Sequence, residues 1–237
     1  MKRLSQILVL LLLIAAPLFV LGLHQQWWSV PRHWNPFMPL HVTDPVTPVT
    51  GWKLSRLEGR PQACLDALNT APEDALDHLP LEDYTPVESC PLTNVVRVRR
   101  TGVTFNNSFV ARCPLALAWV MFERHGLQPA AREQFDQPVQ TVWHYGTFSC
   151  RNIYNREEDR RSDHATASAL DLAALTLADG TRISVQDDWD GEGDKAAFLR
   201  SLQNQACEYF GTVLGPDYNQ AHADHFHLGL RGFRICR

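Results

Sequence analysis

An unbroken apolar run from Ile7 to Leu23 is the strongest constraint in this sequence, and it follows the basic residues Lys2 and Arg3. As a helix, at about 1.5 Å per residue, the run is roughly 25 Å long and approaches the thickness of a hydrocarbon core. A cleaved signal peptide needs a small-x-small site, and we find no good one before His24. We therefore predict that residues 1–24 form a membrane anchor. A cleaved signal segment is the first alternative and a buried core helix the second.

The residues that flank this run predict its orientation. Trp27 and Trp28 follow it directly, as expected for aromatic side chains at a membrane interface. Lys2 and Arg3 favour a cytoplasmic N-terminus, because positive charge is retained on that side. The rest of the chain should then lie outside the inner face of the membrane.

Six cysteines are spread through the remainder of the chain, at Cys64, Cys90, Cys113, Cys150, Cys207 and Cys236. None forms a C-x-x-C pair, which disfavours zinc ribbons and thioredoxin-like motifs. An even number of cysteines beyond an export segment predicts up to three disulfides in an oxidising compartment. The pairing stays open, and buried free thiols are the alternative.

Prolines dominate the segment after the apolar run, at Pro31, Pro36, Pro39, Pro45 and Pro48. Each proline favours an extended backbone at the residue before it. This pattern predicts a semi-stiff linker over 25–51 that holds a folded domain away from the membrane. The domain then covers 52–237, which is long enough for one substantial core.

The charge balance argues against nucleic acid as a partner. The chain has 22 Lys and Arg against 26 Asp and Glu, a formal net charge of −4. It lacks the basic excess that binds a phosphate backbone.

Apolar spacing predicts two helices in the domain, Leu115–His125 ending at Gly126, and Asp194–Phe210 with an inner face that includes Ala197 and Phe198. Strand-like pieces lie at Val95–Val98, Thr141–Ser149, Ala169–Leu177, Thr181–Val185 and His225–Leu230, with a hairpin turn at 178–180. Helices mixed with antiparallel strands indicate an α+β fold, in which helices flank a small antiparallel sheet.

Histidine and aspartate gather in two short segments, which contain His164 and Asp171, and His225 and His227. On a strand, His225 and His227 point to the same face because successive side chains alternate. Asp171 opens an apolar strand, where an unpaired carboxylate is costly to bury. His164, Asp171 and one histidine of the pair would form an N,N,O set with a fourth position open, as in catalytic zinc sites.

Each piece of this pattern has an ordinary structural explanation. An isolated His-x-His is more often a pair of surface or hydrogen-bonded histidines, and seven residues along one helix would separate His164 from Asp171 by about 10 Å. The pattern therefore requires His164 on a turn that leads into the strand of Asp171. The order of a loop histidine, a strand aspartate and a strand His-x-His favours the metal interpretation.

The combination Ser162-x-His164-x6-Asp171 with His225-x-His227 resembles the zinc signature shared by lysostaphin, D-Ala-D-Ala metallopeptidases and the hedgehog N-domain. More closely, 52–237 resembles the bacterial extensin-like C-terminal domain family. The motifs are Cys150-Arg151-Asn152, Ser162-Asp163-His164-Ala165, Ala169-Leu170-Asp171, 177–180, 211–219 and Asp224-His225-Phe226-His227. The spacing His222-x2-His225-x-His227 also resembles penicillin-insensitive murein endopeptidases of the same zinc group.

The resemblance implies that one zinc ion is bound by His164, Asp171 and His227, and that His225 is the catalytic histidine. His222 is expected to orient or supplement His225, and Arg151 to anchor a substrate carboxylate. Asp163 and Asp224 are candidate acceptors for the free N–H of a histidine ring.

Three positions depart from the patterns of the related families. Ala167 and Ser168 stand where the extensin-like family usually has glycine and often has asparagine. Asp224 stands where D,D-carboxypeptidases have a glutamate, so a histidine base is the better analogy.

For an exported chain, this resemblance implies a zinc metallopeptidase that hydrolyses peptide bonds in peptidoglycan by a zinc-activated water, with His225 as the base. The expected location is the bacterial inner membrane, with the N-terminus cytoplasmic and the C-terminal domain periplasmic. The expected partners are peptidoglycan peptides and the membrane. One alternative is a catalytically inactive zinc domain that binds cell wall or protein, and another is a metal-free envelope scaffold.

Overall fold

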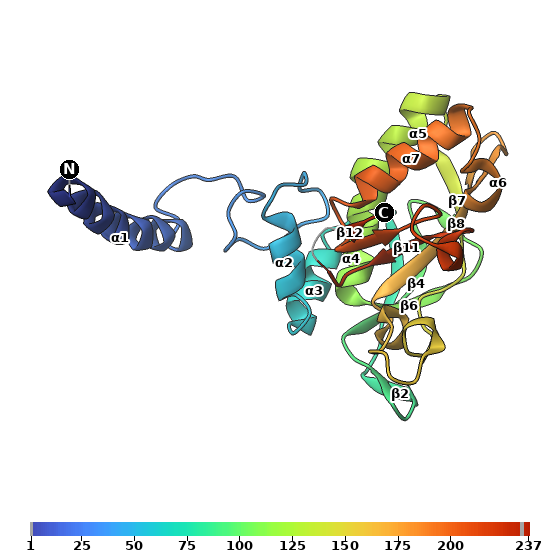
Figure 1. Cartoon of the computed structure of the whole chain (residues 1–237), viewed down its shortest axis with the longest axis horizontal. Helices are drawn as coiled ribbons and strands as arrows, with labels where there is room; N and C mark the ends of the chain where they lie inside the picture. The colour runs from blue at the N-terminus through green and yellow to red at the C-terminus, as the bar shows by residue number, and fades with distance from the viewer. Residues whose placement is uncertain (1, 233–234) are drawn as a thin grey trace.

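The computed structural model describes residues 2–232 and 235–237 (Figure 1). Its helices are α1 Lys2–His24, α2 Thr50–Arg56, α3 Pro61–Leu68, α4 Cys113–Phe122, α5 Gln128–Phe135, α6 Val185–Asp188 and α7 Asp194–Ala206. Its strands are β1 Leu76–Pro80, β2 Tyr84–Val87, β3 Cys90–Leu92, β4 Val95–Thr101, β5 Thr104–Phe105, β6 Phe109–Arg112, β7 Val139–His144, β8 Ala169–Leu177, β9 Arg182–Ser184, β10 Thr212–Leu214, β11 Phe226–Gly229 and β12 Ile235–Cys236. The predicted α+β class is confirmed.

The main sheet has the strand order β12-β10-β11-β8-β7-β5, with β9 paired to β8. Its central strands pair antiparallel, whereas β5 with β7 and β10 with β12 are parallel. A second sheet has the order β1-β4-β6, and β2 and β3 form a separate hairpin. The predicted antiparallel sheet is therefore confirmed in its central strands, and parallel pairs extend it at both edges.

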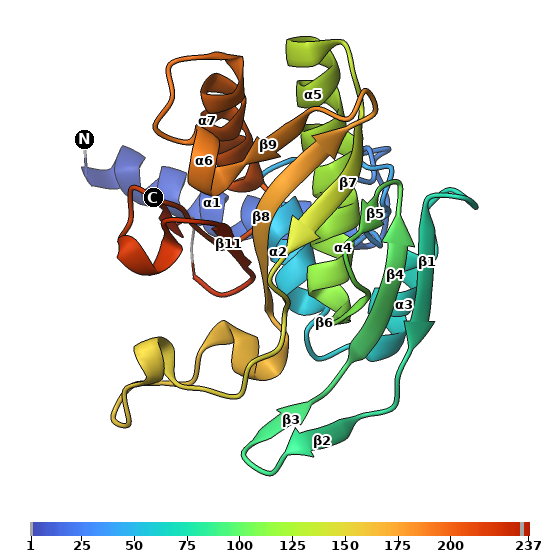
Figure 2. The same ribbon diagram turned by 90° about the vertical axis from the view of Figure 1, so that its right-hand side faces the viewer.

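Helix α4 forms the centre of the core, because each of its residues from Cys113 to Phe122 is buried. A helix that is apolar on all sides has no solvent face. It lies behind β4, β6 and β7 in Figure 2.

The predicted helix end at Gly126 is wrong, because the chain continues through a π-helical turn, Glu123–Leu127, into α5. Phe122 and Leu127 are both buried there, and their burial outweighs the cost of about 1 kcal/mol for a glycine inside a helix. The Phe122 ring also lies 3.0 Å from where a Cβ of Gly126 would be, so a larger residue would be crowded.

Helix α7 ends at Ala206 rather than Phe210, and Cys207, at its C-cap, forms a disulfide with Cys236. Ala197, which the sequence predicts on the inner face of this helix, is exposed, and Ala196 is buried instead.

Among the predicted strands, β8 has the expected bounds, and the turn that joins it to β9 contains Gly180 with φ 89°. Strand β7 ends at His144 instead of Ser149, and Gly146 just beyond has φ 115°, which redirects the chain. Strands β1, β2, β3, β5, β6, β10 and β12 are not among those the sequence predicts.

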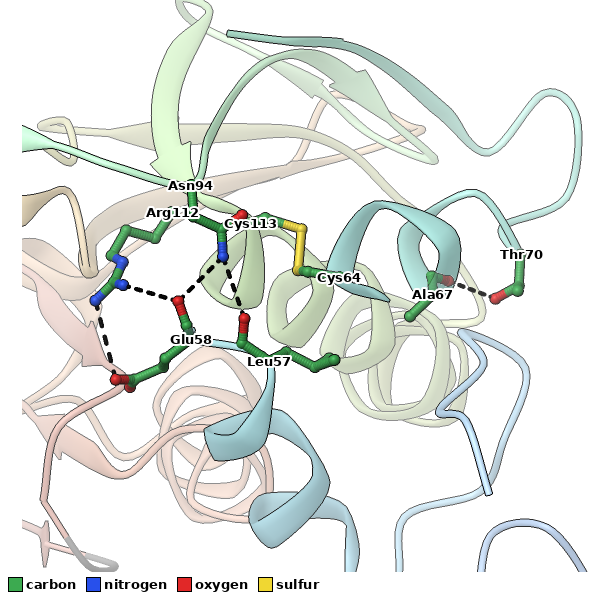
Figure 3. The surroundings of a disulfide bond; sticks show 8 residues. All are labelled: Leu57, Glu58, Cys64, Ala67, Thr70, Asn94, Arg112 and Cys113. Carbon is green, nitrogen blue, oxygen red and sulfur yellow. Dashed lines mark hydrogen bonds and ion pairs between the residues drawn. A yellow bond between two sulfur atoms is a disulfide. The ribbon is translucent and has the colours of Figure 1, made fainter. Parts of the chain in front are cut away.

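All six cysteines form disulfides, which are Cys64–Cys113, Cys90–Cys150 and Cys207–Cys236. The expectation of up to three disulfides is confirmed, and the alternative of free thiols is wrong. Figure 3 shows that Cys64–Cys113 joins α3 to the start of α4. Beside it, Asn94 Nδ2 donates to the carbonyls of Leu57 and Glu58, and so holds the end of α2 against the strands.

Part of the proline-rich segment packs on the domain. Leu40 and Val42 belong to the buried core, and the Arg32 guanidinium lies 2.6 Å from Asp44. Apolar residues between the prolines thus hold the second half of 25–51 against the folded part.

Helix α1 is exposed along most of its length, so it is not a core helix of this chain. Among the described residues, Ser5–His24 is one helix that is long and apolar enough to cross a membrane, and a signal sequence would meet the same test. Figure 1 shows α1 apart from the domain, with its C-terminal end toward α2.

Glu123 is a buried carboxyl group at the start of the π turn, and the hydroxyl of Thr101 donates to it. Burial raises its pKa to about 7, although hydrogen bonds from Thr101 and Trp119 oppose the shift. The folded state therefore favours the protonated group.

This shift predicts a pH-dependent stability. The contribution of Glu123 to the free energy of unfolding is fully present below pH about 4.5. It is lost as the pH rises through about 7, because the carboxyl group ionises more readily in the unfolded chain than in the folded one. As the pH rises from 4.5 to 8, we expect the native protein to lose about 2 to 3 kcal/mol of unfolding free energy that Glu123→Gln retains, because glutamine does not ionise. Urea unfolding across this range measures the difference. Glu133→Gln, at an exposed position of α5, is the control, and parallel curves for the native protein and Glu123→Gln would refute the prediction.

Candidate metal centre

Two paired strands and one tight turn bring His164, Asp171 and His227 together. Asp171 on β8 lies directly opposite His227 on β11 in the antiparallel register. His164 lies in a 3-10 turn, Asp163–Thr166, immediately before β8. The turn begins with the Ser162 side chain accepting from the His164 amide, and it ends at Ala167 with φ 51°. His164 thus lies on a turn before the strand of Asp171, as the metal interpretation requires.

Ala167 has a left-handed backbone, a conformation that glycine adopts without strain. The Ala167 methyl group is fully buried against Leu92 and Val95. Packing therefore compensates for the strained backbone.

His164, Asp171 and His227 each direct one ligand atom toward the same place, and we call these three residues the His–Asp cluster. His164 Nε2 and His227 Nδ1 lie 3.2 and 3.0 Å from Asp171 Oδ1, and 3.1 Å from each other. Ligands of a tetrahedral metal ion, with bonds of 2.0–2.1 Å, lie about 3.3 Å apart. The spacing of the cluster is close to that value.

The outer contacts of the two histidines determine which nitrogen faces the cluster as a lone pair. His164 Nδ1 lies 3.2 Å from the carbonyl oxygen of Thr147, which can only accept, so Nδ1 carries the hydrogen. His227 Nε2 faces a carboxylate oxygen of Asp163 at 3.9 Å. In a neutral ring His164 Nε2 is then unprotonated, and the negative charge of Asp163 favours the neutral tautomer of His227 that has its hydrogen on Nε2 and its lone pair on Nδ1. Three lone pairs thus face one another in a buried place, an arrangement that a cation stabilises.

The charges of the cluster affect one another strongly in the absence of a cation. Burial by itself would raise the pKa of Asp171, but hydrogen bonds with His164 and His227 hold it far below its usual range. Burial would lower the pKa of His227, but the carboxylates of Asp163 and Asp171 raise it to about 9. A proton on His227 therefore takes the place that a metal ion would occupy, and the two compete.

His225 lies beside the cluster with a carboxylate behind it. Its Nδ1 is 2.7 Å from Asp224 Oδ1, and its Nε2 is 3.6 Å from Asp171 Oδ1. The Asp224 carboxylate can only accept, so Nδ1 carries the hydrogen and Nε2 presents a lone pair toward the cluster. Tyr145 packs edge-on against the ring, with 5.7 Å between ring centroids.

His222 is a further neighbour of the cluster. It ends a 3-10 turn, Gln220–His222, and its Nδ1 lies 2.8 Å from the Asn219 side-chain oxygen. Its ring centroid is 5.3 Å from that of His225 and 5.8 Å from that of His227. Burial and the two neighbouring histidines lower its pKa to about 4, so His222 is neutral near pH 7.

Arg151 is placed near the site only through its backbone. Its carbonyl accepts from the Ser162 amide at 3.1 Å, two residues before His164, and Cys150 anchors the same loop to β3. In the part of the chain that the structure describes, the half-buried Arg151 side chain has no hydrogen bond or ion pair. Its guanidinium is therefore free to bind an anion.

Asp163 and Asp224 lie against His227 and His225, where the sequence analysis expects acceptors for histidine ring N–H groups. Thr147 and Tyr145 are neighbours of the site that no local motif predicts, because they act through a backbone carbonyl and an exposed ring. Arg231 is another, and its Nε lies 3.1 Å from Asp163 Oδ1 and fixes that carboxylate.

A family model described as "Extensin-like protein C-terminus" matches residues 62–237. No curated protein and no solved structure matches the chain. The matched residues include the whole His–Asp cluster, His222, His225 and Arg151.

Proposed function

The chain belongs to the extensin-like C-terminal family, and from this premise we propose that it is a zinc-dependent peptidase of the bacterial cell envelope that hydrolyses peptide bonds in peptidoglycan. The observation that carries the proposal is the convergence of three ligand atoms, two ring nitrogens and one carboxylate oxygen, in the His–Asp cluster. A site of this composition, with a histidine beside it, suits hydrolysis by an activated water.

The donor atoms of the cluster fit zinc. His164 Nε2, His227 Nδ1 and Asp171 Oδ1 would hold the ion, and two nitrogens with one carboxylate oxygen form a typical catalytic ligand set. When bound, zinc supplies an acidified water and polarises the carbonyl of the bond to be cut. The Thr147 carbonyl, 3.2 Å from Nδ1, keeps His164 in the tautomer that binding needs, and the charge of Asp163, 3.9 Å from Nε2, favours the matching tautomer of His227.

In this proposal His225 handles the protons. Its Nε2 lone pair points toward the cluster and accepts a proton from the attacking water. Asp224 stabilises the resulting imidazolium through Nδ1–H, at 2.7 Å. His225 then gives the proton to the amine of the leaving group, which completes one hydrolysis. His222 stays neutral and packs against His225, so its role is to orient that ring.

The proposed substrate and location follow from the rest of the chain. Three disulfides suit an oxidising compartment, and α1 would anchor the protein in the inner membrane with its domain in the periplasm. Peptidoglycan is the peptide-containing polymer of that compartment. Its free carboxylates would suit Arg151.

A digest of purified linear and cross-linked muropeptides, followed by mass spectrometry, tests the proposal. We expect products that disappear with a chelator and return with added zinc, and their masses would identify the bond. A folded, zinc-loaded protein that yields no product would favour the alternative of an inactive zinc-containing binding domain. A protein that binds no zinc at all would favour the metal-free scaffold.

Arg151→Lys is expected to raise KM about tenfold with little change in kcat, because a point charge replaces a fork that binds carboxylates through two hydrogen bonds. Steady-state kinetics on the muropeptide identified above measures both constants. Arg160→Lys, on the exposed part of the same loop, is the control. If Arg151→Lys has the same kcat and KM as the native protein, Arg151 does not bind the substrate.

A further inference from the structure

A cavity of about 330 Å³ lies at the junction of α1, the segment 36–40 and α2. Its lining includes His24, Phe37, Trp52, Lys53, Arg56 and Arg60. We call it the α2 pocket. In Figure 1, α2 lies on the side of the domain that faces α1, so a bilayer around α1 would lie next to this pocket.

Contacts fix the pocket to the end of α1. The His24 ring packs edge-on against Phe37, with 5.2 Å between centroids, and the Asn35 side-chain amide donates to the Leu23 carbonyl at 3.2 Å. Further along, Leu40 is buried in the core. The pocket therefore stays close to the point at which the helix would leave a membrane.

The pocket carries positive charge without a balancing acid. No aspartate or glutamate is among its lining residues in the described chain. Arg56 and Arg60 are exposed, and neither makes an ion pair among the residues that the structure describes. The nearby Glu58 instead faces Arg112, with 3.9 Å between Oε2 and Nη1 (Figure 3).

The third cation of the lining, Lys53, is already engaged. Its Nζ donates to the Arg32 carbonyl at 2.6 Å, and its side chain is buried. The two arginines are therefore the groups available to an anion.

Aromatic side chains share the lining of the pocket with these arginines. Trp52 is 43% exposed and Phe37 is 37% exposed, and the Arg56 guanidinium lies 4.6 Å from the centroid of the Trp52 ring. Exposed tryptophans also occur at Trp27 and Trp34. Tryptophan beside arginine is typical of protein surfaces at the level of lipid headgroups.

We propose that the α2 pocket binds the headgroup of an anionic phospholipid in the leaflet from which α1 emerges. Arg56 and Arg60 bind the phosphate, because a guanidinium fork matches two of its oxygens. Trp52 and Phe37 lie against the glycerol and the first carbons of the acyl chains. This binding site is separate from the peptidase proposal, and it depends only on the membrane location proposed for α1.

Native mass spectrometry of the full chain, released from neutral detergent, tests this site with phosphatidylglycerol and phosphatidylcholine as probes. We expect phosphatidylglycerol to bind more tightly. Arg56→Gln combined with Arg60→Gln should weaken its binding about 30-fold, at about one kcal/mol per basic residue near an anionic surface. The control is Arg156→Gln with Arg160→Gln, which removes the same charge from an exposed loop of the domain.

Three results would overturn the proposal. Equal loss of binding in both double variants would indicate a general charge effect. Equal binding of the two lipids would show that the pocket does not recognise an anionic headgroup. Glycerol phosphate that binds as tightly as the lipid would show a soluble phosphate site instead. Circular dichroism of each variant verifies that the exposed substitutions leave the fold intact.

Discussion

Zinc is expected to be absent from Asp171→Asn and from His227→Ala, whereas we expect the native protein to hold one ion per chain. Each substitution removes one of the three donors of the His–Asp cluster. Substitution of a residue that only hydrogen-bonds to a metal ligand typically lowers metal affinity by roughly 10- to 100-fold, and we expect the loss of a ligand itself to lower zinc affinity by more. Metal content after dialysis, with competition by a chromophoric chelator, measures the loss.

The two variants together separate metal binding from folding. His227→Ala leaves Asp171 buried beside only one close histidine of the cluster, and an unpaired buried charge can destabilise the fold. Asp171→Asn keeps the shape and removes that charge. His225→Ala is the matched control, because it removes a neighbouring imidazole that is not assigned as a ligand. Zinc retained at full stoichiometry in a folded Asp171→Asn protein would refute the assigned site.

His225→Ala is expected to keep its zinc and to lose about 10²- to 10⁴-fold in kcat, the usual contribution of a general base. The reason is geometric, since Nε2 points toward the cluster and Nδ1 is held by Asp224. Asp224→Asn should cause a smaller loss, because the imidazole remains but loses the carboxylate that stabilises its charged form. Single-turnover kinetics with the muropeptide substrate, at equal zinc loading, measures both effects.

Full activity in His225→Ala would show that another group accepts the proton. His222 would then be the next candidate, since its neutral ring lies 5.3 Å from that of His225. Loss of zinc from His225→Ala would instead make His225 a fourth ligand. Metal content is therefore measured on the same samples.

Local sequence patterns predicted much of the site. The bounds of β8 are as expected. Strand β11 begins at Phe226 rather than at the predicted His225, yet His225, directly before the strand, and His227 within it both face Asp171. A strand alternates its side chains wherever it forms, so two histidines separated by one residue converge without help from distant parts of the chain. The turn that holds His164 begins at Ser162, a residue type whose side chain readily accepts from a nearby backbone amide.

Other features depended on contacts that no local pattern contains. Gly126 ends a helix by local preference, yet the burial of Phe122 and Leu127 carries the helix through it. The prolines of 25–51 predict a semi-stiff linker that holds the domain away from the membrane, yet Leu40 and Val42 join the core. At Gly126 apolar burial outweighs a helix cost of about 1 kcal/mol, and at Leu40 and Val42 it holds the segment on the domain.

The sequence by itself determined the α+β class, the apolar N-terminal helix, the family and the residue types of the candidate site. Only the tertiary structure decided how the cysteines pair, that the Thr147 carbonyl and the Asp163 carboxylate lie beside the two histidines of the cluster, and that Arg56 and Arg60 line a pocket with no acid among its described lining residues. The physical reason is the range of the interactions. Periodicity, turns and apolar length act within a few residues, whereas disulfides, ring tautomers and unpaired charges depend on residues that folding brings together from far apart.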